Sequence, residues 1–297
     1  MDIESKKFLG QPKNFVSIFN ALLFDGQPVL KPEYLKDENS ELVMNVSSKH
    51  VDIIKRYEDG TYLDLFVIES QSYVDPSMVA RVMEYESVAR MRYIRQNFKK
   101  HVPMHTRLPM ILTVVLYVGE SKWNAAKRLS ELEIIHPGFE DMFNEFKLNL
   151  IELNTNHKYN TGEKATQDFF DLLRMIYRKQ ILKEDLDREF NRDALYFAYV
   201  VTKNKELLNI YQESEKGDVK VCRALDEMFE ESTNKGIQMG IKQGIERGIE
   251  QGIERGEKNT QIKIAIKMLV RNNQTLEEIS EIVGLDLNAL RELKKSI

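Results

Sequence analysis

The sequence predicts an α/β fold followed by an all-helical C-terminal part, and three observations support this class. Residues 49–71 contain two stretches rich in β-branched and aromatic residues on either side of Asp59-Gly60, which is typical of a β-hairpin. An apolar run at 108–118 has the composition of a buried strand. Beyond residue 160 the strand patterns fade, and apolar residues recur at helical spacing. The first half is therefore expected to form a mixed sheet flanked by helices.

Further elements are predicted around the hairpin. Residues 13–24 and 76–98 have helical patterns, and Asp75 with Pro76 is expected to begin the second helix as N-cap and first turn. A further strand is predicted at about 146–153. Three helices are predicted in the second half, at about 169–177, 195–201 and 219–229.

The second strand of the hairpin ends in polar side chains. Glu69 and Gln71 are two residues apart, so in an extended strand they point to the same face. A hairpin with a two-residue loop would place Asp52 opposite Val67, on the same face as Glu69 and diagonal to it. A one-residue slip would move Asp52 to the other face. An even register therefore brings two acids and a carboxamide together.

Two carboxylates at neighbouring strand ends suit a Mg²⁺ site. Mg²⁺ prefers oxygen ligands, keeps several waters, and is usually held by one or two carboxylates together with substrate phosphate. The bound ion lowers the pKa of a water molecule and stabilises negative charge on a phosphate. A simpler interpretation also fits Asp52 and Glu69, because an isolated acid at a strand end or an ion-pair network produces the same pattern.

The order of motifs along the chain resembles a known family. Asp52 is followed by Glu69-Ser70-Gln71-Ser72, and then by the run 75–85, which begins Asp-Pro-Ser-Met. The strand run and the Tyr-Val-Gly and Trp-Asn motifs lie within 108–124, and glycine-isoleucine repeats precede the segment 276–285. In this order they resemble the recombination-promoting nuclease (Rpn) or YhgA-like putative transposase family, of the PD-(D/E)XK nuclease superfamily.

The resemblance implies a PD-(D/E)XK-type core with Asp52 and Glu69 as catalytic metal ligands, with Mg²⁺ or another divalent metal as cofactor. Gln71 occupies a position where many superfamily members have lysine; glutamine donates and accepts hydrogen bonds but carries no charge. The implied activity is that of a metal-dependent DNA endonuclease which promotes recombination or acts with mobile elements. The alternative is a catalytically weak DNA-binding or oligomeric interaction protein that keeps the nuclease fold.

The region after the predicted site is basic although the chain as a whole has a net charge of −4. Residues 71–130 contain ten lysines or arginines and four acids, a surplus of six positive charges. A helical stripe on 76–98 includes the residues predicted to contact DNA phosphates, which are Arg81, Tyr85, Arg92 and Arg95. An ordinary solvated helix face is the alternative.

Composition limits the cellular setting. With 297 residues and 42% hydrophobic content, the chain can bury a sizeable core. The single cysteine, Cys222, excludes an internal disulfide, consistent with a reducing compartment. No apolar run approaches the roughly 18 residues of a membrane span, and residues 1–7 lack the apolar core of a signal peptide. We expect a bacterial cytoplasmic protein with no membrane partner.

A period-four repeat occupies residues 236–256. Glycine recurs every fourth residue, and isoleucine follows five of the six glycines. Six glycines would destabilise an isolated helix by on the order of 6 kcal/mol relative to alanine. In a helix, adjacent glycine and isoleucine rows would form a groove and a ridge for a second helix. The repeat predicts self-association, as a homo-oligomer such as a dimer, with a flexible linker as the alternative.

The last segment is predicted to contain helices at 261–272, at 275–283 and from 286, with Gly284 as a C-cap. It resembles a small helix-turn-helix module, but its acidic residues favour a terminal cap or a piece of a dimer. Four parts are therefore predicted: a nuclease-like core at 1–160, a helical extension packed on it at 161–232, the repeat at 233–258, and the terminal module at 259–297.

Overall fold

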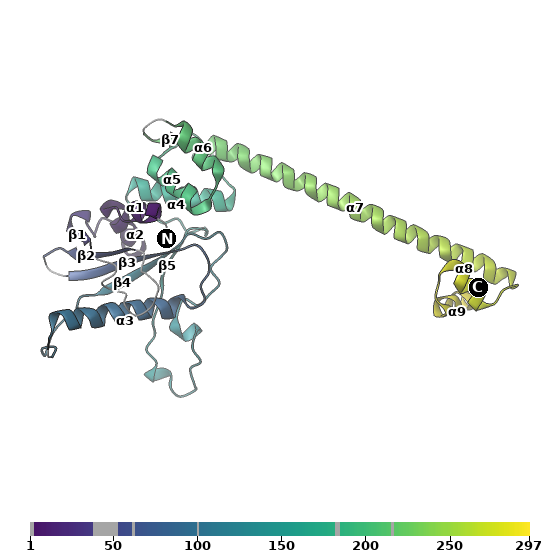
Figure 1. The fold of residues 1–297 in the computed structure, drawn as a ribbon, viewed down its shortest axis with the longest axis horizontal. Helices are drawn as coiled ribbons and strands as arrows, with labels where there is room; N and C mark the ends of the chain where they lie inside the picture. The colour runs from purple at the N-terminus through teal and green to yellow at the C-terminus, as the bar shows by residue number, and fades with distance from the viewer. Residues whose placement is uncertain (1–2, 38–52, 61–62, 100, 182–184, 215–216) are drawn as a thin grey trace. The chain divides into compact units, whose positions relative to one another are not determined.

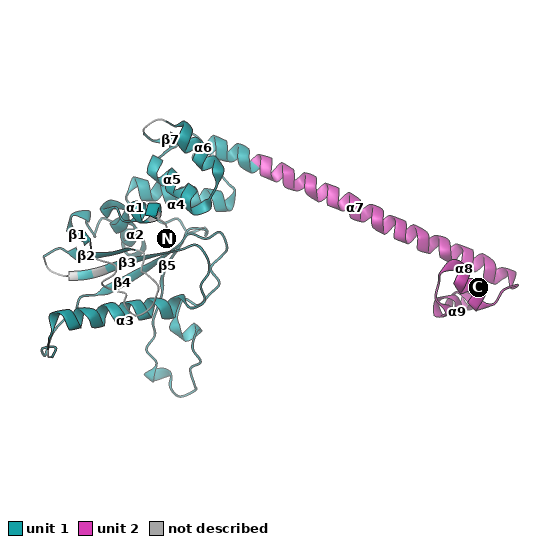
Figure 2. Cartoon of the chain, in the orientation of Figure 1, with its two compact units in different colours: residues 1–229 teal, residues 230–297 magenta. Residues whose placement is uncertain are grey.

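The computed structural model describes residues 3–37, 53–60, 63–99, 101–181, 185–214 and 217–297. Residue contacts divide the chain into two compact units, Met1–Phe229 and Glu230–Ile297, which are coloured separately in Figure 2. The four-part division predicted from the sequence stays a prediction. Within the described residues, no helix combines the length and the apolar composition that a membrane span needs.

The first unit is built around a sheet of five described strands in the order β1-β2-β3-β4-β5 (Figure 1). The strands are β1 (Leu35–Asp37), β2 (Ile53–Glu58), β3 (Leu63–Gln71), β4 (Ile111–Tyr117) and β5 (Asn149–Glu152). β1, β2 and β3 pair antiparallel, whereas β3, β4 and β5 pair parallel. A parallel pair needs a crossover connection, and α3 (Met78–Asn97) provides it between β3 and β4. The mixed α/β sheet predicted from the sequence is confirmed.

The two faces of β3 pack against different helices. Phe66 and Ile68 belong to the largest core cluster, where Phe66 lies against Phe19 of α2 (Pro12–Phe24). Val67 points to the opposite face and packs against Tyr85 of α3. Figure 1 shows α3 on one side of the sheet and α2 on the other. Because Glu69 and Gln71 alternate in phase with Val67, the strand directs them towards α3.

The hairpin register differs from the predicted one by two residues. Glu58 pairs with Leu63 rather than with Thr61, and Ile54, not Asp52, lies opposite Val67. The connection is therefore longer than two residues, and a longer hairpin loop accommodates a glycine at positive φ as readily as a two-residue turn does. A shift of two residues leaves the described side chains of β2 on their predicted faces, and Ile54 accordingly packs with Val67 on the α3 side.

Helices form most of the remaining structure. The α-helices not yet given are α1 (Ile3–Leu9), α4 (Lys164–Arg178), α5 (Arg192–Thr202), α6 (Lys205–Glu213), α7 (Cys222–Arg271), α8 (Leu276–Val283) and α9 (Leu287–Lys295). Short elements are the 3-10 turns η1 (Pro32–Tyr34), η3 (Leu129–Glu131) and η4 (Glu140–Met142) and the strand pair β6 (Glu189–Phe190) and β7 (Val219–Lys220). In the second unit, α8 and α9 pack with the end of α7 around Ala265, Ile279 and Leu290.

Three predicted element boundaries are corrected. The N-cap of α3 is Ser77, not Asp75: the helix begins at Met78, three residues after Asp75, and Asp75 instead accepts a hydrogen bond from the Ser77 backbone N–H. The helix predicted at 219–229 begins at Cys222, since Val219 and Lys220 pair with β6. The repeat and the helix predicted at 261–272 are one continuous helix, α7.

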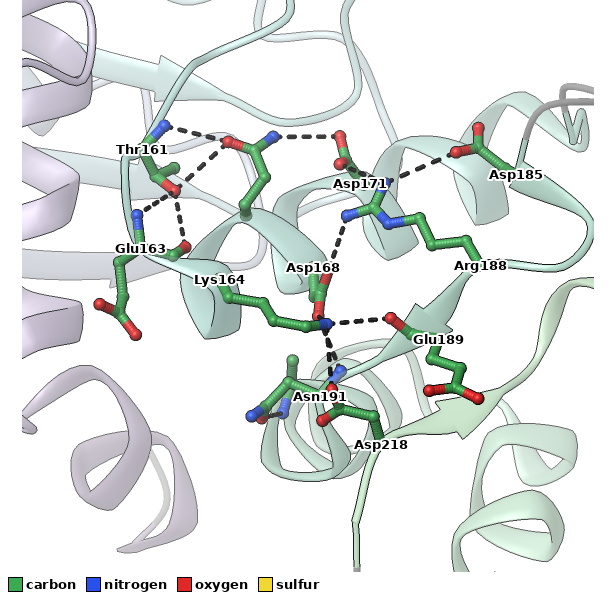
Figure 3. Close-up of polar contacts among 12 residues, drawn as sticks. Thr161, Glu163, Lys164, Asp168, Asp171, Asp185, Arg188, Glu189, Asn191 and Asp218 are labelled. Atoms are coloured by element: carbon green, nitrogen blue, oxygen red, sulfur yellow. Dashed lines mark hydrogen bonds and ion pairs between the residues drawn. The ribbon is translucent and has the colours of Figure 1, made fainter.

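A buried ion-pair network fixes α4 to the segment before α5 (Figure 3). Asp168 and Asp171, one turn apart on α4, are each 1% exposed. Arg188 donates to Asp168 Oδ1 at 2.5 Å and to Asp171 Oδ2 at 2.8 Å. Lys164 Nζ and the Asn191 backbone N–H donate to Asp168 Oδ2, both at 2.7 Å. The acids are satisfied by donors from α4 itself and from the segment before α5, so the network joins structure rather than forming an open site.

Candidate functional site

The candidate site lies where the three parallel strands end. Gln71, Tyr117 and Glu152 are Cα partners across β3, β4 and β5, and all three are buried. In open α/β sheets, ligands bind outside the carboxyl ends of the strands. Glu69 lies one pleat before Gln71 on the same face of β3, and it is 4% exposed. Polar side chains therefore lie together at the carboxyl ends of these strands, which form one edge of the sheet, on the face that α3 covers.

Arg81 of α3 connects Glu69 to a second acid. Its Nη2 donates to Glu69 Oε1 at 3.1 Å, and its Nη1 donates to Asp75 Oδ2 at 2.6 Å. All three side chains are largely removed from solvent, with relative exposures of 14% for Arg81, 5% for Glu69 and 15% for Asp75. One guanidinium thus lies between two carboxyl groups.

Tyr85 completes this network one helical turn after Arg81. Nε and Nη2 of Arg81 lie 3.1 and 2.8 Å from the Tyr85 hydroxyl oxygen, to which they donate. Burial raises the pKa of Tyr85, so the phenol stays protonated. Burial opposes ionisation of Asp75 as well, but hydrogen bonds from Ser77 and Arg81 lower its pKa below the ordinary value. Burial also disfavours charge on Arg81, yet its bonds to Asp75 and Tyr85 raise its pKa. The site therefore contains a fixed cation and an ionised acid.

Gln71 has an unused donor. Its side chain is 5% exposed, and within the part of the chain that the structure describes its Nε2 atom is buried without a hydrogen-bond partner. An unpaired buried amide group costs about 1 to 3 kcal/mol. Such a group at a strand end next to Glu69 is available to a water molecule, an ion or a ligand.

Glu152 and Lys127 lie at the same edge and were not singled out by the sequence. The Lys127 ammonium group forms an ion pair with Glu152, which ends β5 and is 8% exposed. Burial, followed by the charge of Glu152, raises the pKa of Tyr117, the strand partner of Glu152. The one available signal was the position of Glu152 inside the strand predicted at 146–153. Lys127 carried no signal, because a loop of unpredictable path brings it to the sheet.

Comparison with known families identifies the chain at the level of a family. A family model described as "Putative transposase, YhgA-like" matches residues 33–207, more than half of the chain. The chain belongs to this family. No curated protein and no solved structure matches it. The match begins before β1 and ends within α6, so it includes the whole edge where Glu69, Gln71 and Glu152 lie. The resemblance drawn from the order of motifs is confirmed.

Asp52, the other acid of the predicted pair, lies outside the described residues of this YhgA-like chain. Its successor Ile53 is the partner of Ile68, which precedes Glu69. The next residue, Ile54, packs on the α3 face, the face that also holds Glu69. The described ladder therefore has the parity that the prediction requires, and the role of Asp52 stays a prediction.

The donor chemistry of the site fits Mg²⁺. The Glu69 carboxylate and the Gln71 carboxamide provide oxygen atoms on one face of β3, as a hard cation requires. Among the described residues there is no group of three or more acid, histidine or cysteine side chains that could hold a metal ion. Mg²⁺ does not need such a cage, because water and substrate phosphate usually complete its coordination. The edge suits an ion that binds together with its substrate.

The residues predicted to contact DNA fall into two groups. Tyr85 is buried, and Arg81 donates to Glu69 and Asp75, so both side chains belong to the buried network around Glu69. Arg95 is exposed and Arg92 is half-buried, further along α3. Of these four side chains Arg95 is the exposed one, and the contact of Arg92 and Arg95 with DNA stays a prediction.

Proposed function

We propose that this YhgA-like chain is a metal-dependent DNA endonuclease that hydrolyses phosphodiester bonds and promotes recombination or the activity of mobile elements. The observation that carries the proposal is the position of Glu69 and Gln71 on one face at the end of a parallel strand, buried under α3 and within the matched family region. We place this activity in the bacterial cytoplasm, with DNA and a second copy of the chain as partners.

Each residue of the site has a distinct role in this proposal. Asp52 and Glu69 would hold the metal, and a bound ion would supply a water of lowered pKa and offset charge on the phosphate. Gln71 directs its amide group towards the attacking water or a phosphate oxygen, which accounts for an Nε2 atom that has no partner among the described residues. Arg81 keeps the Glu69 carboxylate in a fixed orientation before substrate binds, because its other nitrogen is held by Asp75.

The proposal is tested by the nicking of supercoiled plasmid in Mg²⁺ and in EDTA. The variants are Asp52→Ala, Glu69→Ala and Glu69→Gln, the last of which keeps the side-chain volume and an acceptor for Arg81. Glu84→Ala is the matched control, since Glu84 is an exposed acid on α3. We expect Mg²⁺-dependent nicking by the wild type and the control, and a loss of at least about 100-fold in the three site variants. Equal nicking in all five proteins would contradict the proposal.

A binding measurement separates the proposal from the alternative of a catalytically weak DNA-binding protein. Fluorescent duplex DNA is titrated with wild type, Glu69→Gln and the double variant Arg92→Ala/Arg95→Ala. We expect Glu69→Gln to bind DNA as well as the wild type does and to cut it poorly. The arginine variant should bind more weakly and show a smaller salt dependence, because phosphate contacts release counterions. DNA binding without any Mg²⁺-dependent nicking by the wild type would favour the alternative.

Metal binding can also be followed without activity. Mg²⁺ that binds only the folded protein raises its melting temperature. Glu69→Gln should therefore respond less than the wild type across a Mg²⁺ titration, whereas Glu84→Ala should respond equally. An equal response of the wild type and Glu69→Gln would remove Glu69 from the metal site.

A further inference from the structure

Lys127 presents a partly exposed ammonium group at the carboxyl edge of the sheet. The group forms an ion pair with Glu152, the last residue of β5, and the Lys127 side chain is 46% exposed. An ammonium group has three N–H donors. Glu152 accepts from one of them, and within the described residues the other two have no hydrogen-bond partner. The group is therefore available to an anion at the surface.

The sheet places Glu152 in line with Gln71. Gln71, Tyr117 and Glu152 are Cα partners across β3, β4 and β5, and partners in parallel strands point to the same face. Tyr117 packs with Met78 of α3, and Leu150, two residues before Glu152, belongs to the same cluster. Glu152 therefore shares the α3 face with Gln71. Neighbouring strands are about 4.8 Å apart, so the Cα atoms of these two residues are about 10 Å apart.

Main-chain hydrogen bonds fix the position of Lys127. Its N–H donates to Glu131 Oε2 at 2.7 Å, and its carbonyl accepts the N–H of Leu148 at 2.9 Å. Earlier in the same loop, the buried Trp123 packs edge-on against Tyr117 of β4, with 5.1 Å between the ring centroids. The loop is thus fixed both at Trp123 and at Lys127. A cation held in this way binds an anion with little loss of conformational freedom.

The spacing of donors along this edge suits a ligand that repeats acceptor oxygens. Nε2 of Gln71 is one donor, buried without a partner among the described residues, and the ammonium group of Lys127 is a second. Each strand of DNA carries one phosphate per roughly 3.4 Å of helix axis. About 10 Å therefore spans about three nucleotides of a strand whose reacting phosphate lies beside Glu69 and Gln71.

We propose that Lys127 binds a backbone phosphate of the DNA strand within about three nucleotides of the phosphodiester bond that is cut, and that Glu152 positions its ammonium group. The inference rests on the proposed function, because it takes the reacting phosphate to lie beside Glu69 and Gln71. Lys127 is a substrate-binding residue in this arrangement, and Glu152 is a positioning residue.

The test removes the ion pair as a whole. Lys127→Met/Glu152→Gln loses both charges, so the net charge of the chain is unchanged and no buried carboxylate is left unpaired. The matched control, Lys36→Met/Glu58→Gln, makes the same two changes in another ion pair. That pair lies at the opposite end of β3, because Glu58 is the strand partner of Leu63, its first residue. Urea denaturation verifies that both variants fold.

DNA binding is measured without cleavage, by titration of fluorescent duplex DNA in EDTA over a salt series. We expect Lys127→Met/Glu152→Gln to bind about tenfold more weakly than the wild type, because a charge-assisted hydrogen bond to phosphate is lost. The slope of log K against log salt should become shallower by about one, the value for one phosphate contact. The control should bind within about twofold of the wild type and with the same slope.

The kinetics of plasmid nicking in Mg²⁺ give a second readout. Loss of a contact to a phosphate that does not react should raise KM about tenfold and leave kcat within about threefold. A reduced kcat with an unchanged KM would contradict the proposal, since Lys127 would then act on the reacting phosphate itself.

The outcomes separate this inference from the proposed function. If the wild type binds and nicks DNA, and Lys127→Met/Glu152→Gln matches it in affinity and salt slope, the ion pair is only structural and this inference alone is overturned. A wild type that binds no DNA would overturn both. Weaker binding by the variant, with no nicking by the wild type, would support Lys127 as a phosphate contact and contradict the endonuclease activity.

Discussion

Arg81 determines the electrostatics of the candidate site at the scale of single residues. Its guanidinium lies between Glu69 and Asp75 and also binds the hydroxyl of Tyr85, so three side chains depend on one cation. A lysine could not replace it, because an ammonium group lacks the planar fork that reaches two carboxylates at once. The sequence pattern placed Arg81 on a DNA-contacting stripe, since a helical wheel cannot tell which arginine has a carboxylate within reach.

A substitution at Gln71 is predicted to raise the stability of the fold and to lower the nicking activity. Gln71→Met keeps the length of the side chain and removes the buried Nε2 that has no partner among the described residues. We expect the variant to be more stable by about 1 kcal/mol, because an unsatisfied buried donor is lost. Nicking should fall at least about tenfold, since the amide is proposed to position water or phosphate. Urea denaturation and plasmid nicking on the same preparation measure both effects; a variant that is destabilised and fully active would refute this role.

Glu86 is predicted to make stability depend on pH. It is a buried residue of α3 that faces the sheet, where its Oε1 accepts the Thr113 backbone N–H of β4 at 3.0 Å, and burial raises its pKa. Because the folded-state pKa lies above the unfolded one, the stabilising contribution is complete below the unfolded pKa and is lost as pH rises through the folded pKa. Glu86→Gln keeps the acceptor without the charge, so it should unfold at a higher temperature than the wild type at pH 7.

The same measurement at a series of pH values, with Glu84→Gln as the control, tests the role of Glu86. The advantage of Glu86→Gln should shrink as the pH falls and vanish below the ordinary glutamate pKa of 4.5, where the wild-type carboxyl is protonated in both states. Glu84→Gln changes an exposed acid of the same helix and should match the wild type across the series. A Glu86→Gln variant that is less stable at pH 7 would show that the charge is favourable where it is buried.

At the scale of elements, the α4 network is predicted to hold the helical half together. Asp168→Ala would remove an acid that accepts bonds from Lys164, Arg188 and the Asn191 backbone (Figure 3). Losing one partner of a buried pair costs about 3 to 5 kcal/mol, because the remaining charge is left without compensation.

The control for the α4 network is a second aspartate that is paired with an arginine. Asp187→Ala breaks an exposed ion pair, in which the side chain of Asp187 is 74% exposed and that of Arg223 is 77% exposed. The loss should cost less than about 1 kcal/mol. Urea denaturation of both variants gives the two free energies of unfolding. Similar costs for Asp168→Ala and Asp187→Ala would mean that the buried network contributes no more than a surface pair.

The elements themselves followed largely from local pattern. Alternation placed Glu69 and Gln71 on one face, and that face is the one under α3, because side-chain direction in a strand depends only on parity. The hairpin register was predicted two residues away, since Asp59-Gly60 signals a turn but does not fix the length of the connection. The helix predicted at 219–229 begins three residues later, because the pairing of Val219 with Phe190 is a long-range contact that periodicity does not report.

At the scale of the whole molecule, the carboxyl edge of the sheet brings together residues that are far apart in sequence. The hairpin supplied Glu69 and Gln71 to the predicted site, whereas Lys127 and Glu152 join them only through the parallel order of β3, β4 and β5. Strand order is a property of tertiary packing, so a site assembled across it is only half visible in one sequence.

The first unit is predicted to fold without the second. A fragment of residues 1–229 keeps the start of α7, where Cys222, Leu225 and Phe229 belong to the main core cluster, and it omits the exposed stretch from 230 to 260. We expect its free energy of unfolding to stay within about 1 kcal/mol of that of the full chain measured as a monomer, because the removed residues lie outside that core. It should also remain monomeric and retain nicking, since the candidate site lies wholly within it.

A fragment of residues 1–221 is the control: it loses three buried side chains, each worth about 2 to 5 kcal/mol, and should unfold at a much lower urea concentration. Equal destabilisation of both fragments would show that the first unit depends on the rest of the chain for its fold.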